Sequence, residues 1–365
     1  MIMHVGPYKF SAGAFKELFD DSLDIYINNL QVLRHAILEM TEDSHHQAFF
    51  IFNVVSEENA LESIIPVHSD RVAIIKYNSS TSDLGLHFET MRTLGRGITK
   101  QFSAVLFSNQ GVRGPLVHAK DGKWLGAFRD LLDQNNVALV GPSLSCEVSP
   151  HVQTHTFMVR ASILSMLQET LFSISNSNTS SWLDFIKKFE VGLTTHVMNK
   201  GYNVSSLLYY HKTGKKYFDG TCLPFSRHNP NAVTSILLNP VSWCNIDVER
   251  LVFMKWGGES MKTLGYVCED TLNQMKRSLV TMTANDPSLS LIVPEVHKGA
   301  KLYDMHREWL EEIFRQTIPH VQQRSTKEVQ DQKVKEVGGG RWEERGERGY
   351  EAVGGDVCMY VCMYT

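Results

Sequence analysis

The stretch FSAVLFSNQGVRGP, residues 102–115, joins a run of apolar, β-prone residues to a loop that holds two glycines. A continuous apolar run of this length, bounded by turn residues, predicts a strand that is buried on both faces of a sheet. Such a strand needs helices on both faces of its sheet to exclude water. The stretch therefore indicates an α/β fold with the loop NQGVRGP at a strand end.

The same pattern repeats on either side of this stretch. Buried strands are predicted at 48–55 (AFFIFNVV), 71–77 (RVAIIKY), 137–144 (VALVGPSL), 154–160 (THTFMVR), 204–211 (VSSLLYYH) and 251–256 (LVFMKW). Helices are predicted at 12–40, 58–65, 86–98, 124–133, 161–174, 182–201, 259–283 and 304–317. Strands that alternate with helices predict a Rossmann-like, mostly parallel sheet with helices on both faces. Ligands of such sheets bind beyond the carboxyl ends of the strands.

The whole-chain composition excludes several classes of protein. Of 365 residues, 42% are hydrophobic and 21% are charged, which is typical of a globular protein with a sizeable core. The formal net charge of −4 argues against a nucleic-acid partner, because such proteins usually carry a basic balance or stripe. No segment reaches the roughly 18 consecutive apolar residues of a membrane span.

Composition also divides the chain. Residues 1–323 are expected to form one α/β domain, whereas residues 324–365 are rich in charge and glycine and poor in core-forming side chains. That composition predicts a disordered, low-complexity tail.

The sequence is compatible with two cellular compartments. The first residues, MIMHVGPYKF, lack the basic start and apolar core of a signal peptide. Sequons at Asn78, Asn178 and Asn203 matter only for a chain that enters the secretory pathway. The two expectations are the Golgi lumen, if the chain continues upstream, and otherwise the cytoplasm.

An ordered series of motifs carries a resemblance. It consists of NLQVLRH, FFIFNVV, VAIIKYNSSTSDLG, AVLFSNQGVRGP, VALVGPSLSCEVSPHVQTHTFMVR, FEVGLTTHVMNKGYNV and VERLVFMKW. In this order and spacing, over about residues 23–256, the chain resembles a glycosyltransferase-like family related to bacterial rhamnan-synthesis proteins.

The resemblance implies an A-type glycosyltransferase fold. Its Rossmann-like half, at about residues 12–150, would bind a sugar nucleotide, and the half at about 151–323 would bind the acceptor. The implied activity is polysaccharide biosynthesis by hexosyl or deoxyhexosyl transfer from a nucleotide-sugar donor to a carbohydrate or glycoconjugate acceptor.

Glu190 is the predicted catalytic base. It lies in FEVGLTTHV, on a predicted helix, where the resembled family has an acid-Gly-Leu-Ser pattern. In this chain Val191 precedes the glycine and Thr194 stands in place of the serine. A carboxylate at this position can take the proton of an acceptor hydroxyl. The alternative is a surface glutamate on an amphipathic helix.

The donor is expected to meet two strand-end loops. Asp83, in the turn SDLG, is a candidate for binding ribose or sugar hydroxyls, or it caps the following helix. Asn109 and Arg113 lie in NQGVRGP, where many A-type transferases have Asp-x-Asp and hold Mn²⁺ or Mg²⁺. Because no acid is present in this loop, no metal ligand is assigned and a role for Mn²⁺ or Mg²⁺ stays open. Arg113 is expected to contact phosphate directly or to be an ordinary exposed arginine.

The loop SLSCEVSPHVQ and a later lysine supply the other candidates. Glu147, His151 and Gln153 are predicted to contact donor or acceptor, and Glu147 is also an alternative base or metal ligand. Lys255, which follows a predicted strand, is a candidate for the leaving phosphate.

Two other functions stay open. One is a non-catalytic carbohydrate-binding or scaffold relative of glycosyltransferases, suggested by the missing Asp-x-Asp. The other is a hydrolase with Cys146 as its nucleophile.

Overall fold

The computed structural model describes most of the residues between 23 and 255 and a few short segments outside that range. The described residues are 2–5, 23–42, 47–54, 65, 71–77, 83–99, 101–109, 111–116, 123–146, 149–168, 186–220, 248–255, 274, 277 and 357–360. The predicted helix at 58–65, apart from Ile65, and the predicted helices at 259–283 and 304–317, apart from Gln274 and Arg277, lie outside these residues.

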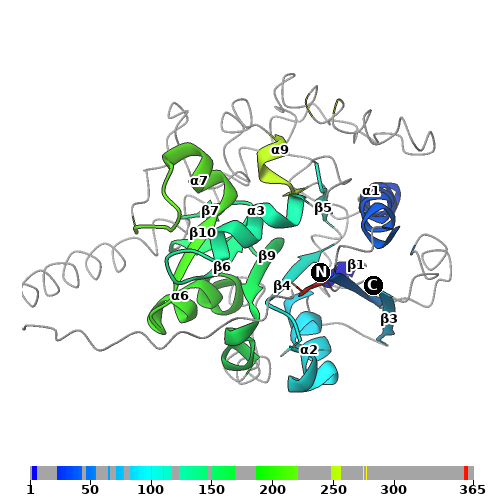
Figure 1. The fold of residues 1–365 in the computed structure, drawn as a ribbon, viewed down its shortest axis with the longest axis horizontal. Coiled ribbons are helices and arrows are strands. Elements are labelled where there is room, and N and C mark those ends of the chain that lie inside the picture. Colours follow the sequence, from blue (N-terminus) through cyan, green and yellow to red (C-terminus); the bar gives the residue numbers. More distant parts are fainter. Residues whose placement is uncertain are drawn as a thin grey trace, which may run out of the picture.

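Helices and strands alternate along the described chain, as the sequence predicts (Figure 1). The helices are α1 (Leu23–Glu42), α2 (Asp83–Thr99), α3 (Lys123–Leu132), α6 (Gly192–Asn199), α7 (Leu207–Thr213) and α9 (Val248–Leu251), with the 3-10 turn η3 (Ala161–Ile163) and the π-helix η4 (Ile186–Val191). The strands are β1 (Ile2–Val5), β2 (Gln47–Val54), β3 (Val72–Lys76), β4 (Ala104–Asn109), β5 (Val112–Arg113), β6 (Val137–Gly141), β7 (Leu144–Ser145), β8 (His151–Val152), β9 (Thr156–Arg160), β10 (Asn203–Ser206), β11 (Met254–Lys255) and β12 (Val357–Tyr360).

One sheet organises the molecule. Strand β3 pairs with β2 at one side, and the order continues through β4, β9 and β6 to β10. Strands β1 and β12 both lie between β2 and β4, where β1 pairs with the second half of β2 and β12 with the first half (Figure 1). All strands of this sheet run parallel except β9, which is antiparallel to β4 and β6. The described part is therefore α/β with a mostly parallel sheet.

Two apolar clusters show that helices cover both faces of the sheet. Alternate residues of β4 belong to different clusters: Leu106 packs on one face and Phe107 on the other. The first cluster also contains Leu33 of α1 and Phe128 of α3. The second contains apolar residues of α2 and α6. This two-sided burial explains why the strands read as continuous apolar runs.

Several predicted elements differ from the structure. The segment 109–115 was expected to be a loop, yet it contains strand β5, which pairs with β11. The strand predicted at 137–144 ends at Gly141, and the loop expected after it contains the β7–β8 hairpin. The strand predicted at 204–211 ends at Ser206, because the Ser206 side chain accepts a hydrogen bond from the Tyr209 backbone and caps α7. The strand predicted at 251–256 is only Met254–Lys255, since Leu251 ends helix α9.

The tail from residue 324 contributes one described strand, β12, and its other residues lie outside the described part. Among the described helices, none combines the length and the apolar character that a membrane crossing requires.

Candidate functional site

Buried polar side chains gather at one edge of the sheet. Strands β2, β4, β6 and β10 end at this edge and the antiparallel β9 begins there. The buried polar residues at or beside these ends are Asn53, Asp83, Ser108, Ser143, Ser145, His151, Gln153, Thr154, His155, Thr156, Ser205 and Ser206. Buried polar groups cost free energy unless they are hydrogen-bonded, so their concentration at one edge calls for a functional explanation. It is also the edge at which open α/β sheets bind ligands.

Asp83 and Asn109, two residues predicted from the sequence, contact each other at this edge. Asn109, the last residue of β4, donates from Nδ2 to Asp83 Oδ2 at 3.0 Å. Asp83 begins α2, and its Oδ1 accepts from the Leu84 backbone N–H at 2.9 Å. Asn109 Oδ1 accepts from the Gly111 backbone N–H at 3.1 Å. Asp83 is therefore both a helix-start residue and part of a polar pair that joins α2 to β4.

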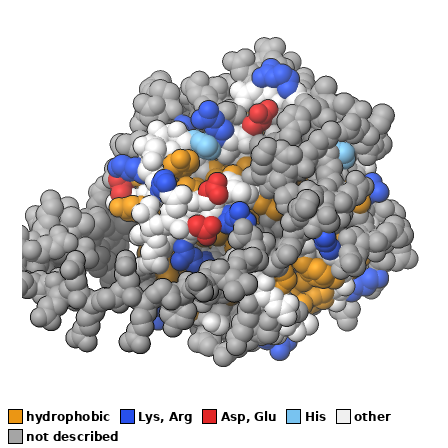
Figure 2. Space-filling model, viewed as in Figure 1, with side chains coloured by type: hydrophobic (Ala, Val, Ile, Leu, Met, Phe, Trp, Pro, Cys, Tyr) orange, Lys and Arg blue, Asp and Glu red, His pale blue; other side chains and the backbone are white. Residues whose placement is uncertain are grey.

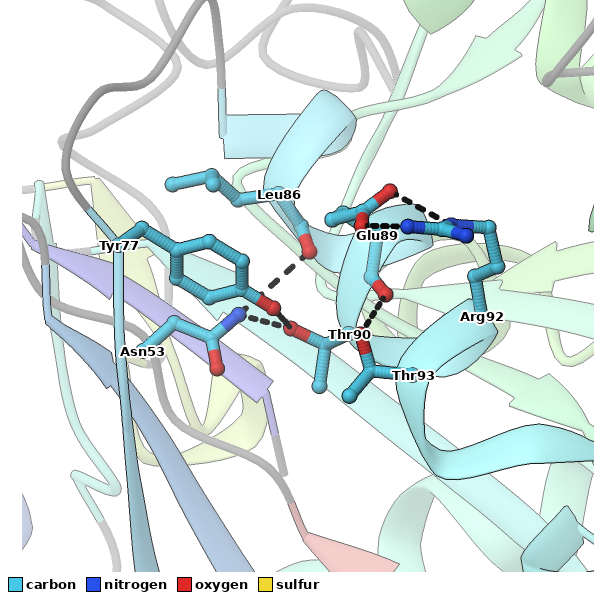
Figure 3. Close-up of polar contacts among 7 residues, drawn as sticks. All are labelled: Asn53, Tyr77, Leu86, Glu89, Thr90, Arg92 and Thr93. Atoms are coloured by element: carbon cyan, nitrogen blue, oxygen red, sulfur yellow. Dashed lines mark hydrogen bonds and ion pairs between the residues drawn. The ribbon is translucent and has the colours of Figure 1, made fainter.

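A second polar group fixes α2 to the sheet (Figure 3). Asn53 of β2 donates from Nδ2 to the Leu86 carbonyl at 3.4 Å and also to Thr90 Oγ1. The Tyr77 hydroxyl lies 2.9 Å from the same Thr90 oxygen. These bonds hold the first half of α2, and hence Asp83, against the ends of β2 and β3. The sequence prediction missed Asn53, although a single polar residue inside the apolar run FFIFNVV was a usable signal.

The Asp83–Asn109 pair does not fit a divalent cation. The bonds to Gly111 and Asp83 fix the orientation of the Asn109 carboxamide, so its N–H group points at the carboxylate. A hard cation needs several oxygen ligands, and this pair offers one carboxylate whose neighbour is a donor. Within the described residues there is no group of three or more His, Cys, Asp or Glu that could hold a metal ion.

Arg113 is fully buried and does not lie in an exposed loop. Its side chain is 0% exposed. Nε donates to Asn29 Oδ1 at 3.1 Å, and an Nη donates to Asn28 Oδ1, both on α1. Burial lowers the pKa of the guanidinium to about 9, so it keeps its charge at neutral pH. The expectation of an ordinary exposed arginine is wrong, because α1 covers this side chain. The expected phosphate contact stays a prediction, and the structure gives Arg113 two asparagine partners instead.

Lys255 is paired with the same short strand. Its backbone lies opposite Val112, and Met254 lies opposite Arg113, in the β5–β11 sheet. The two candidates Arg113 and Lys255 therefore lie at neighbouring positions of the same two-stranded sheet.

His151 and Gln153 lie on the β7–β8 hairpin and just after it, beside the end of β6. Gln153 Oε1 accepts from the Ser143 hydroxyl at 2.5 Å, and the Gln153 backbone N–H donates to the Ser143 carbonyl at 3.1 Å. Thr194 of α6 accepts from the Val152 backbone N–H at 2.9 Å. His151 Nδ1 lies 2.8 Å from the Ser149 carbonyl oxygen. The sequence predicted these two residues together, and the structure places both in one hydrogen-bonded unit with α6.

Glu190 lies on η4, the π-helix that leads into α6, and not on a regular α-helix as predicted. A single π-turn within a helix is uncommon and often marks a functional position. The turn packs against β8, so Glu190 and His151 belong to contacting elements. Glu147 lies outside the described residues. Cys146 is disulfide-bonded, which removes the free thiolate that a cysteine nucleophile requires.

Charge on the described surface is mixed. On the face drawn in Figure 2, the Lys and Arg side chains of the described part are interspersed with Asp, Glu and His. On this face and within these residues, the pattern is that of an ordinary solvated surface and not of a single basic stripe.

No protein-family model matches the chain, and no curated protein and no solved structure matches it.

Proposed function

We propose that this protein transfers a sugar from a nucleotide-sugar donor to a carbohydrate or glycoconjugate acceptor, with an A-type glycosyltransferase fold. The observation that carries the proposal is the set of buried polar side chains at the carboxyl edge of the mostly parallel sheet. The motif series described above supports the same class of activity. The proposal includes a nucleotide-binding half built on β2, β3 and β4 and an acceptor half that begins near the β7–β8 hairpin.

Each part of the edge has a proposed role. Asp83 would bind hydroxyl groups of the donor, since its carboxylate is held in place by Asn109 and Leu84 and a carboxylate accepts hydrogen bonds from hydroxyl groups. Glu190 would accept the proton of the acceptor hydroxyl as that oxygen attacks the donor sugar. In this step the new carbon–oxygen bond forms, the bond from the sugar to the diphosphate breaks, and the nucleoside diphosphate leaves.

The first test is ligand binding. UDP- and GDP-sugars, with and without Mn²⁺, are expected to raise the melting temperature of the wild-type protein, because a ligand that binds only the folded state stabilises it. Asp83→Asn is expected to weaken donor binding by about 10- to 100-fold, the usual value of a hydrogen bond to a charged group. Asp133→Asn is the matched control, because Asp133 is exposed just after α3, before β6 begins.

The second test is turnover. Glu190→Gln is expected to abolish transfer while the protein stays folded and keeps its donor binding, because the amide keeps the shape of the side chain but cannot take a proton. Donor binding without turnover, across many acceptors, would instead favour the non-catalytic carbohydrate-binding relative. The absence of binding to every sugar nucleotide tried would refute the proposed activity.

A further inference from the structure

The hydrogen bond of His151 fixes which ring nitrogen carries a proton. Nδ1 lies 2.8 Å from the Ser149 carbonyl oxygen, and a carbonyl can only accept, so Nδ1 is the donor. Burial lowers the pKa of His151, although the bond to Ser149 opposes this effect. The ring is therefore neutral near pH 7. In a neutral imidazole with a proton on Nδ1, Nε2 carries a lone pair and accepts hydrogen bonds.

The backbone on both sides of the ring is held in place. His151 pairs with Ser145 across the hairpin, and the next residue, Val152, donates to Thr194. Gly141 makes this packing possible, since a Cβ atom there would lie only 2.5 Å from Val152 Cγ1. A ring fixed by its backbone and by Ser149 is preorganised, so little conformational entropy is lost when a ligand binds it.

We propose that His151 is a specificity-determining residue of the site and that its Nε2 accepts a hydrogen bond from a sugar hydroxyl group. The chemistry is selective, because an unprotonated Nε2 accepts a hydrogen bond from an O–H group and has no proton to donate to a phosphate oxygen. This end of the site therefore recognises the sugar and not the diphosphate. The identity of the ligand as a sugar rests on the proposed function, and the hydroxyl can belong to the donor or to the acceptor.

The protonation state is tested without any ligand. Nitrogen-15 NMR of the full chain at pH 7.5 is expected to show a histidine with a protonated Nδ1 and a bare Nε2, and His151→Asn is expected to remove that signal. A proton on Nε2, in either the other tautomer or the imidazolium, would overturn the proposal whether or not the protein is a transferase.

Ligand discrimination is tested with two variants. In His151→Asn the side-chain amide can still donate to Ser149 but no atom replaces Nε2, whereas in His151→Gln the amide reaches the Nε2 position. For a donor hydroxyl, we expect His151→Asn to weaken binding of UDP-glucose or GDP-mannose by about 3- to 10-fold, with UDP and GDP unaffected. If the hydroxyl group belongs to the acceptor substrate, binding of the sugar nucleotide should be unchanged and the KM of the acceptor substrate should rise by the same factor. His151→Gln should recover part of either loss.

His211→Asn is the control, because His211 is exposed on α7. An equal loss for UDP and UDP-glucose, or no loss in either measurement, would overturn the proposal. If the wild-type protein binds no sugar nucleotide, the proposed function fails and the His151 proposal is decided by titration with methyl glycosides. A shift of the Nε2 resonance then supports it, and no shift with any glycoside refutes it.

Discussion

Residues 109–111 and residues 112–115 adjoin in the sequence but lie in different surroundings. Asn109 and Gly111 take part in the Asp83 pair at the carboxyl edge of the sheet, where Asn109 is half-buried. Arg113 is buried against α1, and Gly114 is buried against Val252 and Phe253, between α9 and β11. One glycine-containing loop in the sequence is thus two regions in the structure, and only the first region lies at the proposed site.

This difference shows that residue type alone does not distinguish a residue that binds a ligand from one that packs inside the protein. An arginine such as Arg113 can bind phosphate, and a glycine such as Gly114 lets a ligand approach the backbone closely. In the structure Arg113 donates hydrogen bonds to Asn28 and Asn29, and the groups closest to Gly114 belong to Val252 and Phe253. The comparison predicts that changes after residue 111 reduce stability and that changes at Asn109 alter ligand or metal binding.

The largest expected effect follows replacement of Arg113. Arg113→Met removes the guanidinium hydrogen bonds to the buried Asn28 and Asn29 side chains, and we expect a loss of about 3–4 kcal/mol in the free energy of unfolding. Urea denaturation measures this loss. Arg92→Met is the matched control, because Arg92 is an exposed arginine that pairs with Glu89, and little change is expected.

The reason for that loss can be checked separately. If the amides that lose the guanidinium cause it, the combined variant Arg113→Met, Asn28→Leu and Asn29→Leu should recover much of the stability, because those two amides are then removed as well. A stable Arg113→Met that loses only donor binding would place Arg113 in the ligand site and would contradict the division of the loop.

Gly114→Ala is expected to have the next largest effect. An added Cβ would lie 2.5 Å from Phe253 Cδ1 and 2.5 Å from the Val252 carbonyl oxygen, and Gly114 has a φ of 153°. We expect a loss of about 2–3 kcal/mol, since the second of these atoms belongs to the backbone and cannot move aside easily. The same denaturation experiment on Gly126→Ala should show no loss, because nothing lies within 4 Å of that Cβ position in α3.

The sequence predicted the fold better than it predicted the loops. Strands β2, β3, β4 and β6 and helices α2 and α3 lie where apolar runs and helical periodicity indicate. These signals are local, and burial on two faces makes them strong. The direction of β9 was not predicted, because a buried apolar run has the same composition in a parallel and in an antiparallel strand. Strands β5 and β11 pair over about 140 residues of separation, a contact that no local pattern encodes.

Some residues of the candidate site could be selected from the sequence. A polar residue in the segment after a buried strand is expected at the carboxyl edge, and this rule selected Asp83 and Asn109 without knowledge of their contact. Arg113 also follows β4 closely, and the rule failed there because two asparagines on α1, about 85 residues earlier, surround it. Asn53 was missed because the rule examines residues after a strand and Asn53 lies inside one.

The smallest effect on stability is expected at Asn109, together with a gain of metal binding. Asn109→Asp replaces an N–H···O bond with two neighbouring carboxylates, and we expect a loss of about 1 kcal/mol at pH 7.5. Two carboxylates at one strand end are a better match to a hard cation than the wild-type pair. Millimolar Mn²⁺ should therefore raise the melting temperature of Asn109→Asp by several degrees more than that of the wild type.

The exchanged pair tests whether the contact itself matters. In the double variant Asp83→Asn, Asn109→Asp the carboxamide and the carboxylate change places, so the hydrogen bond can form in the opposite direction. Stability should return close to that of the wild type and the gain from Mn²⁺ should disappear, a coupling that a double-mutant cycle measures. If the double variant is as unstable as the sum of the single variants, the two side chains act independently, and Asp83 would serve α2 alone as a helix-start residue.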